Sequence, residues 1–182
     1  MSNTKLTTGK VRLSYANIWK PKAMAEGQEE KYSVSLLIPK SDTKTVNAIK
    51  QAIKTAAEEA QHTKFGGKVP GNLKSPLRDG DDERSDDPNY AGHYFMNCSS
   101  KSKPIIVDRR REQIVNEDEV YSGCFAHVSV NFYAYNTSGN KGVACGLGNI
   151  QKVADGDPLS GGKGNIESEF KVLDEDDDDF LG

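Results

Sequence analysis

The most constraining feature of this sequence is a long alternation of side-chain character over residues 120–135. One set of alternate positions is small and apolar, whereas the other set combines polar and aromatic residues. A period of two predicts a β-strand with one face in a core and the other face outside it. The core set is Cys124, Ala126, Val128, Val130, Phe132 and Ala134, and the outer set is Phe125, His127, Ser129, Asn131, Tyr133 and Tyr135.

The same period marks two earlier strands, and one segment has helical spacing instead. In residues 9–16 the alternation puts Val11, Leu13 and Tyr15 on the core face. Apolar residues at helical spacing predict one helix at about 42–61, with Ser41 or Asp42 as its N-cap. The other predicted segments are strands at 31–38, 93–99, 104–107 and 143–153, a hairpin turn at 136–142, and a long loop rich in Gly, Pro and acids at 66–92.

Together these elements predict a mainly β fold with five or six strands and one inserted helix. A small antiparallel barrel of the oligonucleotide-binding (OB) type accommodates them, and a β-sandwich is the alternative. We expect residues 1–154 to form the folded domain. Residues 155–173 have the Gly-rich composition of a flexible linker, and residues 174–182 form an acidic tail.

The formal net charge of -3 hides two opposite charge distributions. Residues 174–179 are six consecutive acids, and a second acidic cluster lies at 79–87. Outside both clusters, 15 acidic residues face 23 basic residues, so the remainder of the chain is basic. A block of like charges cannot pack, and it indicates a disordered interaction tail, although a segment that only confers solubility would have the same composition.

Several classes of protein are disfavoured by the sequence. The longest apolar run, residues 36–38, is too short to span a bilayer, and the first residues lack the apolar stretch of a signal peptide. Three cysteines (Cys98, Cys124 and Cys145) without close pairing argue against a disulfide framework and fit a reducing cytosol. No P-loop or dinucleotide motif is present, and we expect no cofactor.

The enzyme alternative rests on the acidic loop at 79–87. Asp79, Asp81 and Glu83 could ligate Mg²⁺ for phosphodiester hydrolysis. A metal site at Cys124 and His127 is disfavoured, because residues three apart on a strand point to opposite faces. We expect the protein not to be an enzyme, and a metal-dependent nuclease remains the alternative.

Binding of nucleic acid accounts for more of the sequence. Single strands are held by basic residues that track phosphates and by aromatic rings on which bases stack. The outer face of 120–135 supplies such rings, unless a second layer such as the helix covers them. The candidate contacts are Arg12, Lys31, Tyr94, Lys101, Lys103, Arg109, Arg110, Arg111, Phe125, His127, Tyr133, Tyr135 and Lys141. The candidate partner-binding tail is Asp174, Glu175, Asp176, Asp177, Asp178, Asp179 and Phe180.

Several short stretches together resemble a known family. They are Gly9-x-Val11-Arg12-Leu13-Ser14-Tyr15, Tyr32 to Lys40, Leu77-x-Asp79-Gly80-Asp81, Tyr121-Ser122-Gly123, Asn131 to Asn136, Lys141-Gly142-Val143 and Gly146-Leu147-x-Asn149-Ile150-Gln151. Over about residues 5–160 the chain resembles the Enc34-type phage single-stranded-DNA-binding proteins, and more distantly the T7-type protein. The resemblance implies an OB barrel that coats single-stranded DNA during phage replication or recombination, in the cytoplasm of an infected bacterium.

The tail fits this resemblance with one departure. Such proteins often end in acids followed by a terminal aromatic residue, but here Leu181 and Gly182 follow Phe180. We expect the tail to compete for the basic surface when DNA is absent and to recruit replication or recombination proteins when DNA is bound. An exposed barrel edge would allow a homodimer. A DNA mimic that occupies another protein's groove is the remaining alternative.

Overall fold

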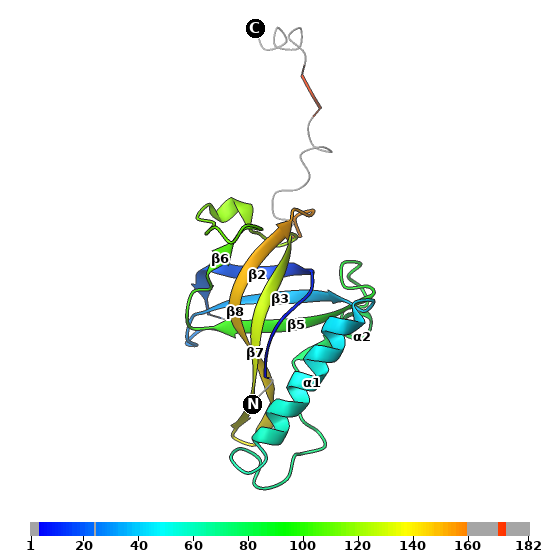
Figure 1. The fold of residues 1–182 in the computed structure, drawn as a ribbon, viewed down its shortest axis with the longest axis vertical. Helices are drawn as coiled ribbons and strands as arrows, with labels where there is room; N and C mark the ends of the chain where they lie inside the picture. The colour runs from blue at the N-terminus through cyan, green and yellow to red at the C-terminus, as the bar shows by residue number, and fades with distance from the viewer. Residues whose placement is uncertain (1–3, 24, 160–170, 174–182) are drawn as a thin grey trace.

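Five long strands form a closed barrel in the computed structural model, which describes residues 4–23, 25–159 and 171–173. Along the ring the order is β7–β2–β3–β5–β8, and pairing of β7 with β8 closes it. The predicted OB-like barrel with one long helix is therefore confirmed (Figure 1). The long strands are β2 (Val11–Lys22), β3 (Lys31–Pro39), β5 (His93–Ser100), β7 (Phe125–Thr137) and β8 (Asn140–Ala154).

The sequence predicts an antiparallel barrel, but the pairing is not antiparallel throughout. Strand β5 pairs with β8 in parallel, with Cys98 opposite Cys145. A ring of five strands cannot alternate direction at every neighbour, so at least one parallel pair is required. Three short strands extend the sheet, namely β1 (Lys5–Thr7), β4 (Leu77–Asp79) and β6 (Ile106–Val107), and β6 also pairs with β8 in parallel.

The predicted helix is α1 (Thr43–Glu59), and it runs beside the β7–β8 hairpin where that hairpin extends beyond the barrel (Figure 1). Its N-cap is Asp42, whose carboxylate accepts a hydrogen bond of 3.2 Å from the backbone N–H of Thr45. Val46 and Ile49 on its inner face are buried in the main core. The helix thus covers one end of the barrel and leaves the outer faces of β2, β3 and β5 uncovered by α1.

Segment 66–92 is more ordered than a loop. It contains β4, which pairs with β5, and the short helix α2 (Gly80–Glu83). Beyond α2, Tyr90 is buried and its ring meets Phe95 edge-on, with 5.3 Å between the centroids. Tyr90, Phe95 and Leu37 form a second apolar cluster, separate from the main core. The composition of this segment predicts a loop, because β4 forms only by pairing with β5, and a distant pairing partner is not visible in local composition.

Strand β2 changes the direction of its side chains halfway along. Val11 and Leu13 are fully buried as predicted, but Tyr15 is 61% exposed, so its predicted core position is wrong. The register between β2 and β3 shifts between Ser14 and Asn17, and Tyr15 has a positive φ of 48°. Such a bulge adds residues to one strand and re-aims the side chains next to it.

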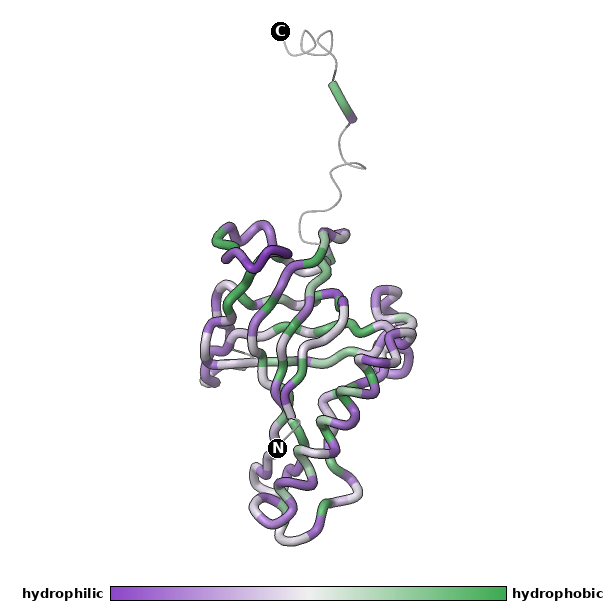
Figure 2. The backbone as a smooth tube through the Cα atoms, in the orientation of Figure 1, coloured by the Kyte–Doolittle hydropathy of each residue, from purple (hydrophilic) through white to green (hydrophobic). Residues whose placement is uncertain are grey.

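Elsewhere the alternation is confirmed, and hydrophobic and hydrophilic positions alternate along the strands (Figure 2). The core set of β7 is buried apart from the partly buried Ala134. The strand begins at Phe125, because residues 121–124 form a turn that precedes it. A 3-10 turn, η1 (Glu117–Glu119), lies in the preceding connection. Within the described ranges, no helix is long and apolar enough to cross a membrane.

Candidate nucleic-acid interface

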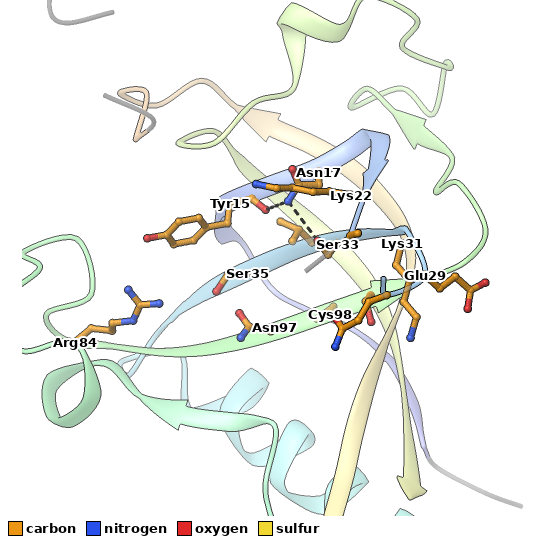
Figure 3. A pocket seen from close by; sticks show the side chains of 14 residues that line it. Tyr15, Asn17, Lys22, Glu29, Lys31, Ser33, Ser35, Arg84, Asn97 and Cys98 are labelled. Carbon is orange, nitrogen blue, oxygen red and sulfur yellow. Dashed lines mark hydrogen bonds between the residues drawn. The ribbon is translucent and has the colours of Figure 1, made fainter. Parts of the chain in front are cut away.

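A groove of about 830 Å³ crosses the outer faces of β2, β3 and β5 (Figure 3). Its floor is built from small polar side chains in register on adjacent strands: Ser33 opposite Ser99, and Ser35 opposite Asn97. These positions alternate with the core residues of the same strands, so they point away from the barrel interior. The floor is therefore neutral, polar and free of bulky side chains.

Tyr15 and Arg84 stand at one end of the groove (Figure 3). The guanidinium carbon of Arg84 lies 5.8 Å from the centroid of the Tyr15 ring and 5.2 Å from that of Tyr90. The Arg84 guanidinium is a permanent cation, as arginine always is in proteins, and hydrogen bonding to Tyr15 raises its pKa further. This end thus combines an exposed aromatic ring with a positive charge.

Two further cations stand at the other end. Lys22 and Lys31 are in register where β2 and β3 are joined by the connection 23–30, and both line the groove. Glu29 also lines this end, and its carboxylate pairs with Lys101 at 3.3 Å. Two candidates from the sequence therefore lie at this end of the groove: Lys31 lines it, and Lys101 pairs with Glu29 beside it.

This arrangement matches the chemistry of a single strand. An exposed ring can stack on a base, the cations can neutralise phosphates, and the polar floor can form hydrogen bonds with the edges of bases. The outer face of these strands is also the surface that OB barrels use for oligonucleotides.

Other sequence candidates lie on surfaces outside the groove. Arg12 donates hydrogen bonds to the carbonyl oxygens of Gly123 (3.0 Å) and Asp157 (2.6 Å), and its guanidinium lies 5.7 Å from the Phe125 ring. His127 Nδ1 lies 3.0 Å from the carbonyl oxygen of Thr8. Arg12 and Phe125 therefore lie at the junction of β2, β7 and segment 155–159, whereas His127 lies beside Thr8 in the connection between β1 and β2.

The remaining candidates are dispersed further. Tyr133 is 45% exposed on the β7–β8 hairpin, which also carries Tyr135 and Lys141. Tyr94 lies beneath two ammonium groups, 5.2 Å from Lys40 Nζ and 5.5 Å from Lys50 Nζ. Lys103 covers the Trp19 ring, Arg109 donates to the carbonyl of Val153, and Arg110 and Arg111 occupy the turn after β6. The structure thus spreads these side chains over several surfaces, and their DNA contacts stay predictions.

The acidic cluster at 79–87 is held by neighbouring cations. Lys40 Nζ lies 2.8 Å from Asp79 and 2.7 Å from Asp81, and these contacts lower the pKa of both carboxyls and raise that of Lys40. Glu83 pairs with Arg78. In the part of the chain that is described, no group of three or more His, Cys, Asp or Glu side chains is placed to hold a metal ion. The geometry therefore gives the nuclease alternative no support.

Segment 155–159 brings the chain to the Arg84 end of the groove. Tyr121 donates a hydrogen bond of 2.9 Å to the carbonyl of Gly156, and the N–H of Leu159 donates one of 2.9 Å to the carbonyl of Ser122. The Leu159 side chain packs on the cluster of Leu37, Tyr90 and Phe95. The predicted tail residues 174–180 lie outside the described residues.

Comparison with known proteins shows the family of the chain. The family model described as "Enterobacter phage Enc34, ssDNA-binding protein" matches residues 4–181. The chain belongs to this family. Protein p50 of Acyrthosiphon pisum secondary endosymbiont phage 1 is 34% identical over 175 residues, which cover 93% of this chain and 94% of that protein.

Two solved structures of similar fold extend the comparison. The single-stranded DNA-binding protein of bacteriophage Enc34, solved in complex with single-stranded DNA, has a TM-score of 0.77 at 23% identity, covering 86% of this chain and 90% of that one. The single-stranded DNA-binding protein gp2.5 of bacteriophage T7 has a TM-score of 0.61 at 18% identity, covering 93% and 96%. At identities below 25%, the similarity to these two structures shows a shared fold.

Sequence reasoning found Lys31 but missed the other side chains on which the groove of this Enc34-family chain depends. Tyr15 was assigned to the core because a bulge cannot be seen in an alternating pattern. Arg84 was counted with the acidic loop that surrounds it. The face of β5 that carries Asn97 also carries the apolar Phe95, which obscures the alternation. The buried Tyr90, which supports Arg84, was the available signal, since an aromatic residue inside a polar loop usually packs on something.

Proposed function

We propose that this protein binds single-stranded DNA, without strong sequence preference, in the groove across β2, β3 and β5. The observation that carries the proposal is the exposed Tyr15 ring beside Arg84, at one end of a polar groove whose other end holds Lys22 and Lys31. Membership of the Enc34 family supports the same ligand, as does the complex of the Enc34 protein with single-stranded DNA.

Affinity then has two sources. The cations displace counterions from the phosphates, so binding weakens as salt rises. The rings stack on bases at roughly 1–3 kcal/mol each, whatever the base. The candidates on the β7–β8 hairpin, namely Tyr133, Tyr135 and Lys141, would extend the path of the bound DNA beyond the groove. Arg109, Arg110 and Arg111 would contact the phosphates of a longer DNA strand.

The acidic segment 174–179 serves as a competitor for the groove and, once DNA has displaced it, as a docking segment for replication or recombination proteins. The position of Leu159 against Tyr90 and Phe95 supports this, because it places the last residue of segment 155–159 beside the rings that hold Arg84. A tethered segment acts at a high effective concentration. The protein would work in the cytoplasm of the infected bacterium, where two copies would pair as a homodimer.

A titration of fluorescent oligonucleotides tests the proposal. Single-stranded DNA, duplex DNA and RNA of equal length are each titrated with the full chain at several salt concentrations. We expect the tightest binding for single-stranded DNA and a steep loss with salt. Absence of any shift at low salt would refute the proposal and favour the DNA-mimic alternative. Adding Mg²⁺ or Mn²⁺ to the same samples should leave the strand intact, whereas cleavage abolished by Asp79→Ala and Asp81→Ala would establish a nuclease.

A further inference from the structure

We infer that Asn97 and Ser35 form a subsite in this groove that binds the Watson–Crick edge of an unpaired base. The inference rests on the proposed function, because it assumes that a single strand enters the groove. It goes further by assigning to two side chains the selection of unpaired over paired bases. Neither residue is charged, so the subsite is distinct from the cations that hold phosphates.

The first observation is a pair of unused polar groups on the groove floor. The hydroxyl of Ser35 is buried, with the residue only 3% exposed, and it has no hydrogen-bond partner among the described residues. Most buried polar atoms in proteins do have a partner, so an orphan in a groove points to a ligand. Asn97 faces Ser35 across the β3–β5 pairing, and its exposed amide likewise has no partner in the described part of the chain.

Two neighbouring polar groups, Ser14 and Asn17, already have partners. Ser14, in register with Ser35 on the other side, has its hydroxyl 3.4 Å from that of Tyr90. The amide of Asn17 donates to the carbonyl of Tyr15 at 3.2 Å and to Ser33 at 3.4 Å. Among the described floor residues, Asn97 and Ser35 are the facing pair in which neither side chain has a hydrogen-bond partner, because Ser33, opposite Ser99, accepts from Asn17.

The second observation is the order in which the aromatic ring, the polar pair and the lysines follow one another along the groove. Ser35 and Asn97 lie between the Tyr15–Arg84 end and the Lys22–Lys31 end (Figure 3). A nucleotide also presents three kinds of surface, namely a ring face, a base edge and a phosphate. A base whose face meets Tyr15 would direct its edge toward the floor, and the backbone would continue toward the lysines.

The chemistry of the pair fits an unpaired base of any type. An amide carries both donors and an acceptor, and a hydroxyl both donates and accepts. The two groups can therefore adapt to the Watson–Crick edge of each of the four bases. In duplex DNA that edge is occupied by the complementary base, so the subsite favours single strands without reading sequence.

The test compares oligo-dT with an abasic oligonucleotide of equal length, which keeps the phosphates and removes the bases. The variants are Asn97→Ala and Ser35→Ala. The control is Asn47→Ala, which removes an exposed amide from α1, away from the groove. We expect the wild-type preference for oligo-dT over the abasic strand to fall about fivefold or more in Asn97→Ala, the lower end of what one base-edge contact contributes. The preference should fall less in Ser35→Ala and stay unchanged in Asn47→Ala.

Two further readouts separate a binding role from a structural one. Because the Ser35 hydroxyl has no partner to lose, Ser35→Ala should not lower the thermal unfolding midpoint. The salt dependence should also be unchanged, since no phosphate contact is removed. An unchanged oligo-dT preference in both variants overturns the subsite while leaving the proposed function standing. Failure of the wild-type protein to bind oligo-dT overturns the proposed function itself.

Discussion

The guanidinium of Arg84 covers the Tyr15 ring at 5.8 Å, although the two residues come from the cap of α2 and from a bulge in β2. Arg84 is itself held by Tyr90 and Phe95, at 5.2 and 5.7 Å from their ring centroids. A cation over an aromatic face is attracted by the ring quadrupole. The contact therefore holds an exposed tyrosine in place before any ligand arrives.

Replacing Tyr15 should test the stacking role directly. We expect Tyr15→Ala to weaken binding of single-stranded DNA by roughly 1–3 kcal/mol, because one ring face available to a base is lost. Tyr15→Phe keeps the ring and should bind within about twofold of the wild type. Fluorescence anisotropy with one labelled oligonucleotide measures both. Equal affinities for the alanine variant and the wild type would remove Tyr15 from the interface.

Arg84 should contribute through both its charge and its planar shape. Arg84→Lys keeps the charge but loses the stack on Tyr15, because an ammonium does not match the guanidinium plane. We expect Arg84→Lys to bind more weakly than the wild type with an unchanged salt slope. Arg84→Ala should also reduce the slope by about 0.7, the value for one phosphate on a single strand. A salt titration distinguishes the two variants, and identical slopes in all three proteins would mean that Arg84 contacts no phosphate.

Acid should loosen the segment that carries Arg84. The pKa values of Asp79 and Asp81 are lowered by hydrogen bonds from Lys40, so their stabilising effect is present above the ordinary aspartate pKa and is lost as the pH falls below it. We expect amide hydrogen exchange in residues 77–93 to accelerate, relative to the rest of the barrel, as the pH falls below about 4.

A paired substitution identifies these two carboxyls as the cause. The variant Asp79→Asn with Asp81→Asn should already exchange faster at neutral pH and should lose the additional acid response. Asp86→Asn, at an exposed acid of the same segment, should behave as the wild type. If the double variant keeps the full acid response, other groups are responsible.

The parts of the fold that sequence predicted are those that repeat with a regular period. Strand β7 alternates strictly, and the predicted core positions from Cys124, just before the strand, to Phe132 are buried as expected. Helix α1 has apolar residues at helical spacing and a capping aspartate at 42, and both features are local. Local patterns of this kind are visible in sequence because each residue's role depends on its immediate neighbours.

The groove was not predictable in the same way, because it depends on distant pairings. The outward direction of Tyr15 depends on a shift in register against β3, and the position of Arg84 depends on the packing of Tyr90 on Phe95. The outer face of β7 was expected to hold the interface because its aromatic residues were conspicuous. The outer faces of β3 and β5 carry small polar residues instead, and because these side chains are small, they leave the space that forms the groove.

The cysteines on β5 and β8 should be protected from reagents in the folded protein. The thiols of Cys98 and Cys145 lie 3.2 Å apart and are buried, and burial raises the pKa of Cys98 well above its ordinary value. A thiol that stays protonated is a poor nucleophile. We expect no alkylation of Cys98 by iodoacetamide at pH 8 until denaturant is added, as followed by mass spectrometry. Rapid labelling under native conditions would show that the β5–β8 seam opens.

Removing the acidic tail should strengthen binding of single-stranded DNA at low salt. Deleting residues 174–182 leaves residues 1–173 with a net charge of +3, because six acids are lost. The chain approaches the groove at Leu159, beside the Tyr90 and Phe95 that support Arg84, so a tethered competitor would act at a high local concentration. We expect affinity to rise by about tenfold, which corresponds to about 1.4 kcal/mol of competition.

Salt and a charge-only variant separate competition from a general effect of length. Since the competition is electrostatic, the truncated and full chains should converge in affinity as the ionic strength increases. A full-length variant with the acids at 174–179 replaced by their amides should behave like the truncation, because it keeps the length and removes the charge. Equal affinities of the full and truncated chains at low salt would show that the tail does not occupy the groove, and the acidic segment would then act only on other proteins.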